Sequence, residues 1–245
     1  MAGIRRHPGV TPARRRADAR RDPLLAVLET LRPDESLADA RDHALLLIGW
    51  KAALRTDDLA RLQMSDLHAG PEGLSVHLRR SKTDQHGHGT TIGIAAPTPI
   101  PSSDHEDHQS DDEDAVGERT VGERALLDAG AAWVRWRDRL GAHGILDGPA
   151  WRGIDRYDTR PRTSGLHRNS IAEIIKRRAA AAGLEDADRW GGHSLRRGFA
   201  TEAIAASVPE RDVQRHGRWR SRASMDPYID AARTFDPTNP TYWLR

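Results

Sequence analysis

Residues 191–232 read GGHSLRRGFATEAIAASVPERDVQRHGRWRSRASMDPYIDAA, and this stretch decides the fold class. Its apolar spacing predicts a helix over about 193–206. A second helix, to about residue 216, follows the capping box Ser207-Val208-Pro209-Glu210, which has a proline in its first turn. A last helix is expected over about 222–233. The C-terminal third of the chain is therefore predicted to be helical.

Four polar and aromatic side chains of the same stretch are candidates for a functional site because of their spacing. His193 and Arg196 are three residues apart on the first helix, so they share a face. Trp219 follows the second helix, and Tyr228 lies nine residues beyond it. Taken singly, each has a structural interpretation: a helix N-terminal histidine, a surface arginine, a core tryptophan, a solvent-facing tyrosine. His216, three residues before Trp219, is interpreted as a structural residue or one that faces the chain's partner.

Upstream of this stretch, the spacing of the apolar residues is that of helices, except in one segment where it alternates as in β-strands. Leu74, Val76 and Leu78 alternate with polar residues, which predicts a half-buried strand, and residues 90–94 read as its hairpin partner. Residues 64–68 fit a third short strand. Helices are expected at 22–31, 36–51, from Thr56, at 119–140 and at 168–182, with an irregular segment at 141–166. The predicted fold class is mainly α with a small antiparallel β-sheet, an α+β architecture.

Length and composition exclude several classes of protein. The chain has 245 residues, enough for one catalytic domain with an arm. It has no cysteine, which excludes disulfides, cysteine nucleophiles and thiolate zinc sites. No run of 18 apolar residues is present and the basic N-terminus lacks an apolar segment behind it, so neither a transmembrane helix nor a secretory signal is predicted. A cytoplasmic protein without a membrane partner is the default expectation.

Charge is distributed unevenly along the chain. Residues 1–22 hold seven arginines and two aspartates, a net of +5, and residues 189–222 carry the same net charge. Between them, residues 104–128 carry a net charge of −8. Two basic segments around an acidic one favour a polyanionic partner, although an arginine-rich composition alone would produce similar clusters. The proline-rich and acidic residues 97–118 are interpreted as a disordered loop, in preference to a metal site at His105 and His108.

In this order and spacing, the motifs resemble those of the tyrosine recombinases, or phage-type integrases. The resemblance covers about residues 20–235, as the catalytic domain. Each motif is weak alone, and the agreement of all of them in order is what makes the resemblance specific. The family commonly has glutamate three residues after its first arginine, where this chain has the shorter Asp58. The matching segments are ALRTDDLARLQMSDL (53–67), SKTDQ (81–85), HSLRRGFAT (193–201), GRWRS (217–221) and Tyr228.

The resemblance implies a metal-free and ATP-free cleavage of DNA. Tyr228 would be the nucleophile and form a 3′-phosphotyrosyl intermediate, which conserves the energy of the phosphodiester. Arg55 and Arg196 would hold the two non-bridging oxygens with their planar, permanently charged forks. No cofactor is expected.

The same resemblance assigns four supporting residues. Lys82, at the hairpin tip, would protonate the leaving 5′-oxygen, and His193 would assist proton transfer from the tyrosine. Trp219 would donate its indole N–H to the phosphate, and Asp58 would orient Arg55 or His193. The other tyrosines, Tyr157 and Tyr242, lack neighbours of the right type.

Double-stranded DNA is the expected partner. A group of arginines near the motifs is predicted to contact its backbone: Arg197, Arg215, Arg218, Arg220 and Arg222. Residues 1–22 resemble the basic arm or linker of the family, residues 23–235 its catalytic domain, and residues 236–245 a tail that would dock on a neighbouring subunit of a homotetramer. The family's N-terminal core-binding domain is expected to be absent.

The predicted function is that of a site-specific DNA recombinase or integrase of a mobile element or chromosome. Two alternatives stay open. A type IB topoisomerase resembles the family in fold and in its Arg-Lys-Arg-His-Tyr set. A truncated remnant that binds DNA without recombining it would explain the missing domain.

Overall fold

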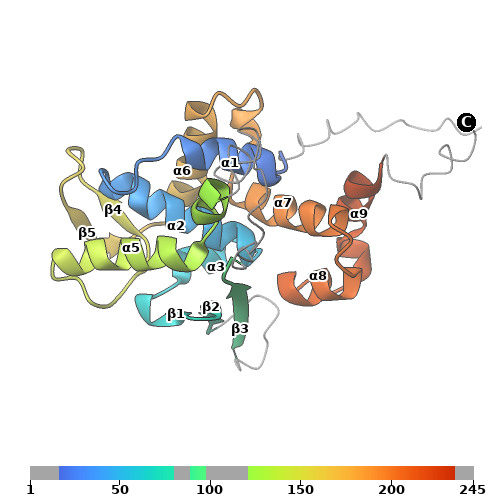
Figure 1. Ribbon diagram of the computed structural model, residues 1–245, viewed down its shortest axis with the longest axis horizontal. Coiled ribbons are helices and arrows are strands. Elements are labelled where there is room, and N and C mark those ends of the chain that lie inside the picture. Colours follow the sequence, from blue (N-terminus) through green and yellow to red (C-terminus); the bar gives the residue numbers. More distant parts are fainter. Residues whose placement is uncertain (1–16, 80–88, 98–120, 235–245) are drawn as a thin grey trace, which may run out of the picture.

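The structure, a computed structural model, describes residues 17–79, 89–97 and 121–234. It is mainly helical, which confirms the predicted fold class, and its described residues form two small antiparallel sheets where one was predicted (Figure 1). The elements are α1 (Arg21–Glu29), α2 (Leu37–Lys51), α3 (Thr56–Arg61), β1 (Leu67–Gly70), β2 (Gly73–Leu78), β3 (Thr90–Ala95), α5 (Ala129–Ala142), β4 (Arg152–Ile154), β5 (Pro161–Gly165), α6 (Arg168–Ala181), α7 (Gly192–Ala205), α8 (Glu210–Gly217) and α9 (Asp226–Arg233), with short 3₁₀ turns at Met64–Asp66, Ala187–Arg189 and Arg222–Ser224.

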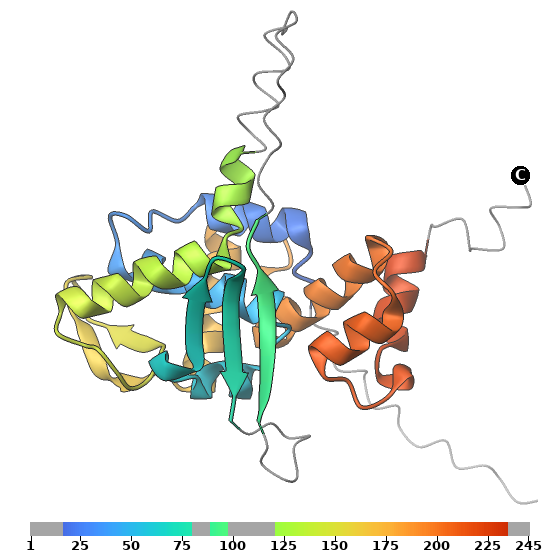
Figure 2. The same ribbon diagram turned by 60° about the horizontal axis from the view of Figure 1, so that its bottom comes forward.

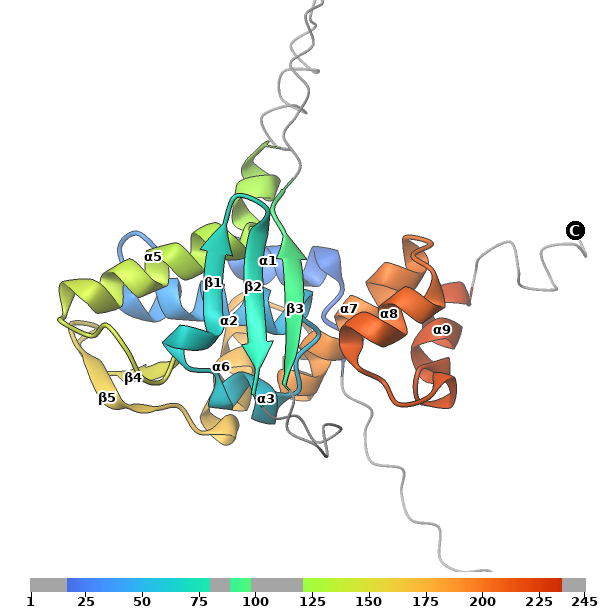
Figure 3. The ribbon, with the colours of Figure 1, turned by 90° about the horizontal axis from the view of Figure 1, so that it is seen from below.

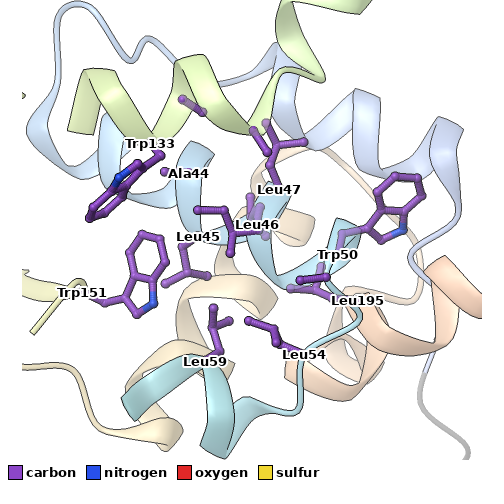
Figure 4. Close-up of a cluster of buried hydrophobic side chains, with 14 of the residues drawn as sticks. Ala44, Leu45, Leu46, Leu47, Trp50, Leu54, Leu59, Trp133, Trp151 and Leu195 are labelled. Atoms are coloured by element: carbon purple, nitrogen blue, oxygen red, sulfur yellow. The ribbon is translucent and has the colours of Figure 1, made fainter. Parts of the chain in front are cut away.

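Helix α2 is the centre of the core. Its N-terminus is capped by the Ser36 side chain, which accepts a hydrogen bond from the backbone N–H of Asp39. Most of its side chains are buried, because α5, α7 and α3 pack around it. Trp133 and Trp151 meet edge to face beside it, with ring centroids 6.1 Å apart (Figure 4). This core fixes the positions of α3 and α7, which carry arginines of the predicted site.

The larger sheet has the order β1-β2-β3 and lies across one face of the helical body (Figure 3). Its register pairs Leu67 with Val76 and Val76 with Ile92, so the alternating apolar residues face the core together. The strand expected at 64–68 begins three residues later, because Met64–Asp66 forms a 3₁₀ turn closed by reciprocal hydrogen bonds between Gln63 and Asp66.

Two expectations for the middle of the chain are wrong. Residues 141–166 are not wholly irregular, since β4 and β5 pair as a second sheet. The buried Arg152 holds this hairpin by donating to the backbone oxygens of Asp147 and Thr163. The helix expected over 119–140 is interrupted: residues 121–126 are helical, and α5 begins at Ala129 because the Asp128 side chain caps it.

The last helices form a separate cluster at one end of the molecule. Helix α7 leads out of the body, and α8 and α9 pack on it in all three ribbon views (Figures 1–3). They share a second apolar core: Ala53, Ala200, Ile204, Val213, Trp219, Met225, Tyr228 and Ile229. The predicted nucleophile therefore belongs to a small cluster that touches the main body chiefly through α7.

Residues 17–21 form a strap across α7. The backbone N–H of Ala19 donates to Ser194 O at 3.2 Å, and the Trp50 indole donates to Ala19 O at 2.8 Å. The buried Ala17 and Ala19 belong to the main core. The basic arm predicted to reach residue 22 therefore extends too far, because its last residues are part of the folded body.

Several predicted features lie outside the described residues: the arm up to residue 16, the hairpin tip with Lys82, residues 98–120 with His105 and His108, and the tail from 235. Among the described residues, no helix is both long and apolar enough to cross a membrane.

Candidate active site

A pocket of about 380 Å³ opens between α3, α7 and α9. It brings together five of the seven residues predicted to be catalytic. Asp58 lies behind Arg55, and Lys82 is outside the described residues. The pocket is lined by Arg55, His193, Arg196, Trp219, Arg220, Ser224 and Tyr228.

Arg55 enters the pocket from the N-terminus of α3. It is the residue before the first turn of that helix, with an extended backbone (φ −74°, ψ 150°). Its guanidinium lies 3.7 Å from Oδ2 of Asp58, which is almost fully buried. This distance exceeds a normal hydrogen bond, and the buried Nη1 of Arg55 has no hydrogen-bond partner among the described residues. Nη1 is the atom that faces Asp58, so this ion pair falls short of a hydrogen bond, and Arg55 at the same time lines the pocket.

Arg196 is the deepest cation of the site. It is 2% exposed, donates from Nη1 to Ala53 O at 2.5 Å, and lies 3.8 Å from the centroid of the Trp219 ring. Burial, with the nearby guanidiniums of Arg55 and Arg218, lowers the pKa of Arg196 to about 9. The site is thus short of negative charge, and an anion between these guanidiniums would relieve their repulsion.

Tyr228, on α9, lines the same pocket as the guanidiniums of Arg55 and Arg196. Its hydroxyl lies 3.5 Å from Nε2 of His193, a residue on the exposed side of α7. Its ring packs against Trp219, with centroids 5.7 Å apart, and is 8% exposed. A separation of 3.5 Å allows proton transfer after a small approach, such as catalytic pairs make when substrate binds.

Two of the five arginines predicted to contact the DNA backbone are buried, which corrects that prediction for them. Arg197 does not line the pocket: it pairs with Asp18 of the strap at 2.5 Å, and its guanidinium carbon lies 5.7 Å from the centroid of the Tyr228 ring. The side chain of Arg218 is 8% exposed and lies 4.0 Å from Oδ2 of Asp58. The other three are exposed: Arg215 and Arg222 pair with Asp212 and Glu210 at 3.2 and 2.9 Å, and Arg220 lies at the pocket rim.

The remaining candidates have structural roles. His216 bonds through Nε2 to Lys51 O at 2.7 Å and stacks on Phe199, so it ties α8 to the end of α2. Tyr157 is 68% exposed and lies beside Arg156, away from the pocket. The presence of Arg218 beside Asp58 was not predicted. Its one signal in the sequence is that an arginine immediately precedes Trp219.

Comparisons with known proteins point to one family. The model of the phage integrase family matches residues 152–234. An "Integrase/recombinase xerD homolog" of Selenomonas ruminantium is 31% identical over 212 residues, which are 86% of this chain and 53% of that protein. This chain therefore spans about half the length of that relative.

Solved structures show the same fold. The XerH site-specific recombinase bound to palindromic difH substrate, in a post-cleavage complex, superposes with a TM-score of 0.60 at 15% identity, covering 99% of this chain and 58% of that one. The XerA recombinase superposes with a TM-score of 0.54 at 14% identity, covering 91% and 61%.

Proposed function

Because this chain belongs to the tyrosine recombinase family, of the phage integrase type, we propose that it cuts and rejoins DNA strands through a 3′-phosphotyrosyl intermediate at Tyr228. The proposal makes it a site-specific recombinase or integrase that needs neither metal nor ATP, with double-stranded DNA in the cytoplasm as its partner. Lys82 is included in the mechanism on the family resemblance alone.

One observation carries this proposal: a tyrosine hydroxyl, a histidine and two guanidiniums line a single pocket. The Tyr228 oxygen is the nucleophile best suited to phosphoryl transfer among the lining residues, since the other hydroxyl there belongs to the exposed Ser224 and has Ser221 O as its acceptor. His193 carries the only imidazole among the lining residues, the side chain most often used as a base in such pairs. A nucleophile beside a base and opposite fixed cations is the arrangement that phosphoryl transfer needs.

In the forward step, the Tyr228 oxygen attacks phosphorus and a bond from phosphorus to the tyrosine oxygen forms. The bond from phosphorus to the 5′-oxygen breaks, and the strand end leaves as a 5′-hydroxyl. The phenolic proton passes toward Nε2 of His193, 3.5 Å away, and Lys82 supplies the proton of the leaving oxygen. Attack by a 5′-hydroxyl reverses each step. Energy is conserved because one phosphoester replaces another.

The guanidiniums stabilise the charge that develops on the non-bridging oxygens. Arg55 and Arg196 are held by separate elements, α3 and α7, so they approach a phosphate from two directions. The Trp219 ring stacks on Arg196 and fixes the plane of its guanidinium. Preorganised donors of this kind contribute most when water is excluded, and Arg196 is almost completely buried.

Two further parts of the proposal concern contacts to the DNA backbone and the assembly of subunits on DNA. The exposed Arg215, Arg220 and Arg222 lie on the same cluster as the pocket and suit contacts to neighbouring phosphates. We propose that the subunits act as a homotetramer on DNA, with residues 236–245 docking on a neighbour. Deleting residues 234–245 should abolish assembly on DNA and leave single-strand cleavage measurable.

Covalent trapping tests the proposal. The protein is incubated with nicked suicide duplexes from DNA flanking its gene, and a denaturant-resistant protein–DNA adduct is sought. The adduct should form with the unaltered chain and with Tyr157→Phe, and vanish in Tyr228→Phe. If the unaltered chain and Tyr228→Phe both bind duplex and neither forms an adduct, the result would contradict the proposal and favour a DNA-binding remnant. Relaxation of supercoiled plasmid without strand exchange would favour a type IB topoisomerase.

A further inference from the structure

Arg218 has a backbone conformation that disfavours its own side chain. It follows the last residue of α8 with φ 57° and ψ 43°, the left-handed region in which glycine is the usual residue. The turn is tight because Gly217 lies directly against the Trp219 ring, where a Cβ would come within 1.6 Å of a ring carbon. The chain reverses here to place Trp219 over Arg196, and the arginine occupies the strained position of that reversal.

The side chain of Arg218 is buried beside like charge. It is 8% exposed, and its Nε and Nη2 have no hydrogen-bond partner among the described residues. Burial and Arg55 lower the pKa of Arg218 to about 10, although Asp58 acts in the opposite direction. Backbone conformation, desolvation and repulsion thus all act against an arginine here. Costs of this kind persist in proteins mainly where they serve function.

The geometry around Asp58 shows what the arginine does. One oxygen, Oδ2, lies 3.7 Å from the Arg55 guanidinium and 4.0 Å from that of Arg218. Neither guanidinium is within hydrogen-bond distance of that oxygen. The carboxylate is therefore shared between the two guanidiniums without a hydrogen bond to either, and Arg55 at the same time lines the pocket. Without Arg218, the buried carboxylate would draw Arg55 into a full ion pair and away from the pocket.

We infer that Arg218 is a positioning residue that shares the Asp58 carboxylate with Arg55 and so holds the Arg55 guanidinium open toward an anionic ligand. Arg218 does not line the pocket and touches no ligand itself. With Arg196, the three arginines and one aspartate carry a net charge of +2, which suits the extra negative charge of a phosphorane. The inference rests on the proposed function only in naming that ligand as a DNA phosphodiester.

Arg218→Gly separates this role from a structural one. Glycine removes the backbone strain and the buried charge, so the melting temperature should not fall, whereas covalent cleavage of a suicide duplex should slow about tenfold or more. Ser207→Gly is the matched control, because Ser207 is exposed and also left-handed, with φ 62°. It should relieve strain and leave cleavage unchanged. Full cleavage by Arg218→Gly, or a slowing that merely follows a lower melting temperature, would overturn the inference.

A double variant tests whether Arg218 acts through Asp58. Adding Asp58→Asn to Arg218→Gly removes the carboxylate that would capture Arg55, so cleavage should recover in part. A further loss, equal to the product of the two single losses, would show that the residues act independently and would refute the sharing.

The inference stays testable even if the chain forms no adduct with any duplex, an outcome that would refute the proposed function alone. Inorganic phosphate should raise the melting temperature of the unaltered chain by occupying the pocket. Arg218→Gly should lose most of that rise. An unchanged rise would overturn the inference.

Discussion

Gly198 is the point at which the strap can be detached by a single methyl group. A Cβ on Gly198 would lie 1.8 Å from Ala19 O and 2.2 Å from Ala19 C, and both are backbone atoms that cannot rotate away. Gly198→Ala must therefore push residues 17–21 off α7. Alanine favours the helix itself by about 1 kcal/mol over glycine, so any net loss measures the strap.

The size of that loss follows from the contacts the strap makes. Detachment breaks the hydrogen bonds from Ala19 N to Ser194 O and from Trp50 Nε1 to Ala19 O, each contributing about 1 kcal/mol. It also leaves Arg197 without Asp18, its partner at 2.5 Å, at a cost of about 3 kcal/mol for a buried charge. We expect Gly198→Ala to lose about 4 kcal/mol after the helix gain, or roughly 12 °C in melting temperature for a chain of this size.

Urea unfolding followed by tryptophan fluorescence measures this loss. Gly141→Ala is the matched control, because Gly141 also lies in a helix and a Cβ there meets nothing within 4 Å. It should be neutral or stabilising. The strap also reaches the nucleophile helix, since Arg20 donates to Ala231 O of α9 at 3.1 Å. Gly198→Ala should therefore slow adduct formation as well. Equal stability of the two variants would refute the reasoning, because the strap would then contribute nothing.

Two further predictions concern buried titratable groups. Burial lowers the pKa of His216, so as the pH falls from about 7 to about 5 the unfolded chain binds the proton before the folded chain does. The folded state therefore loses stability over this window. The urea midpoint should drop, and it should drop less in His216→Gln. Asp42 is fully buried and accepts hydrogen bonds from Arg41 at 2.8 Å and from Arg178 at 2.7 Å. Asp42→Asn should therefore lower the free energy of unfolding by about 3–5 kcal/mol. A loss below about 1 kcal/mol would contradict a buried network.

The sequence predicted the fold where local signals and burial agree. Helix α2 was expected over 36–51 and observed over Leu37–Lys51, because a serine cap precedes a run that is apolar on nearly every face. The β4–β5 hairpin was missed for the opposite reason. Its strands are polar and rich in glycine and proline, and they are held by the guanidinium of Arg152, which no local pattern reveals.

The site residues were predictable as a set, since their order along the chain carries the information, but the neighbouring arginines were not. Arg196 and Arg197 are adjacent in sequence and have different polar partners. One faces Trp219 in the pocket, and the other faces Asp18, which is 179 residues away. Which side receives which partner depends on where the strap and α8 pack. That depends on tertiary structure, so only Arg196 is assigned a specific role, from the motif, whereas Arg197 is assigned to the DNA backbone, the most general role for a basic residue.

The structure thus separates three uses of one residue type in an arginine-rich chain. Arg197 has a structural role: the Asp18 carboxylate neutralises its charge, and it does not line the pocket. Arg215 is a surface charge, whose contribution would fall with salt. Arg55, Arg196 and Arg218 share one carboxylate among them, and that shortage makes them a receptor for an anion. Burial distinguishes Arg197 from Arg215, and the number of carboxylates within reach distinguishes both from the arginines around Asp58. An aspartate placed beside Arg196 should therefore disable the pocket as effectively as removing an arginine would.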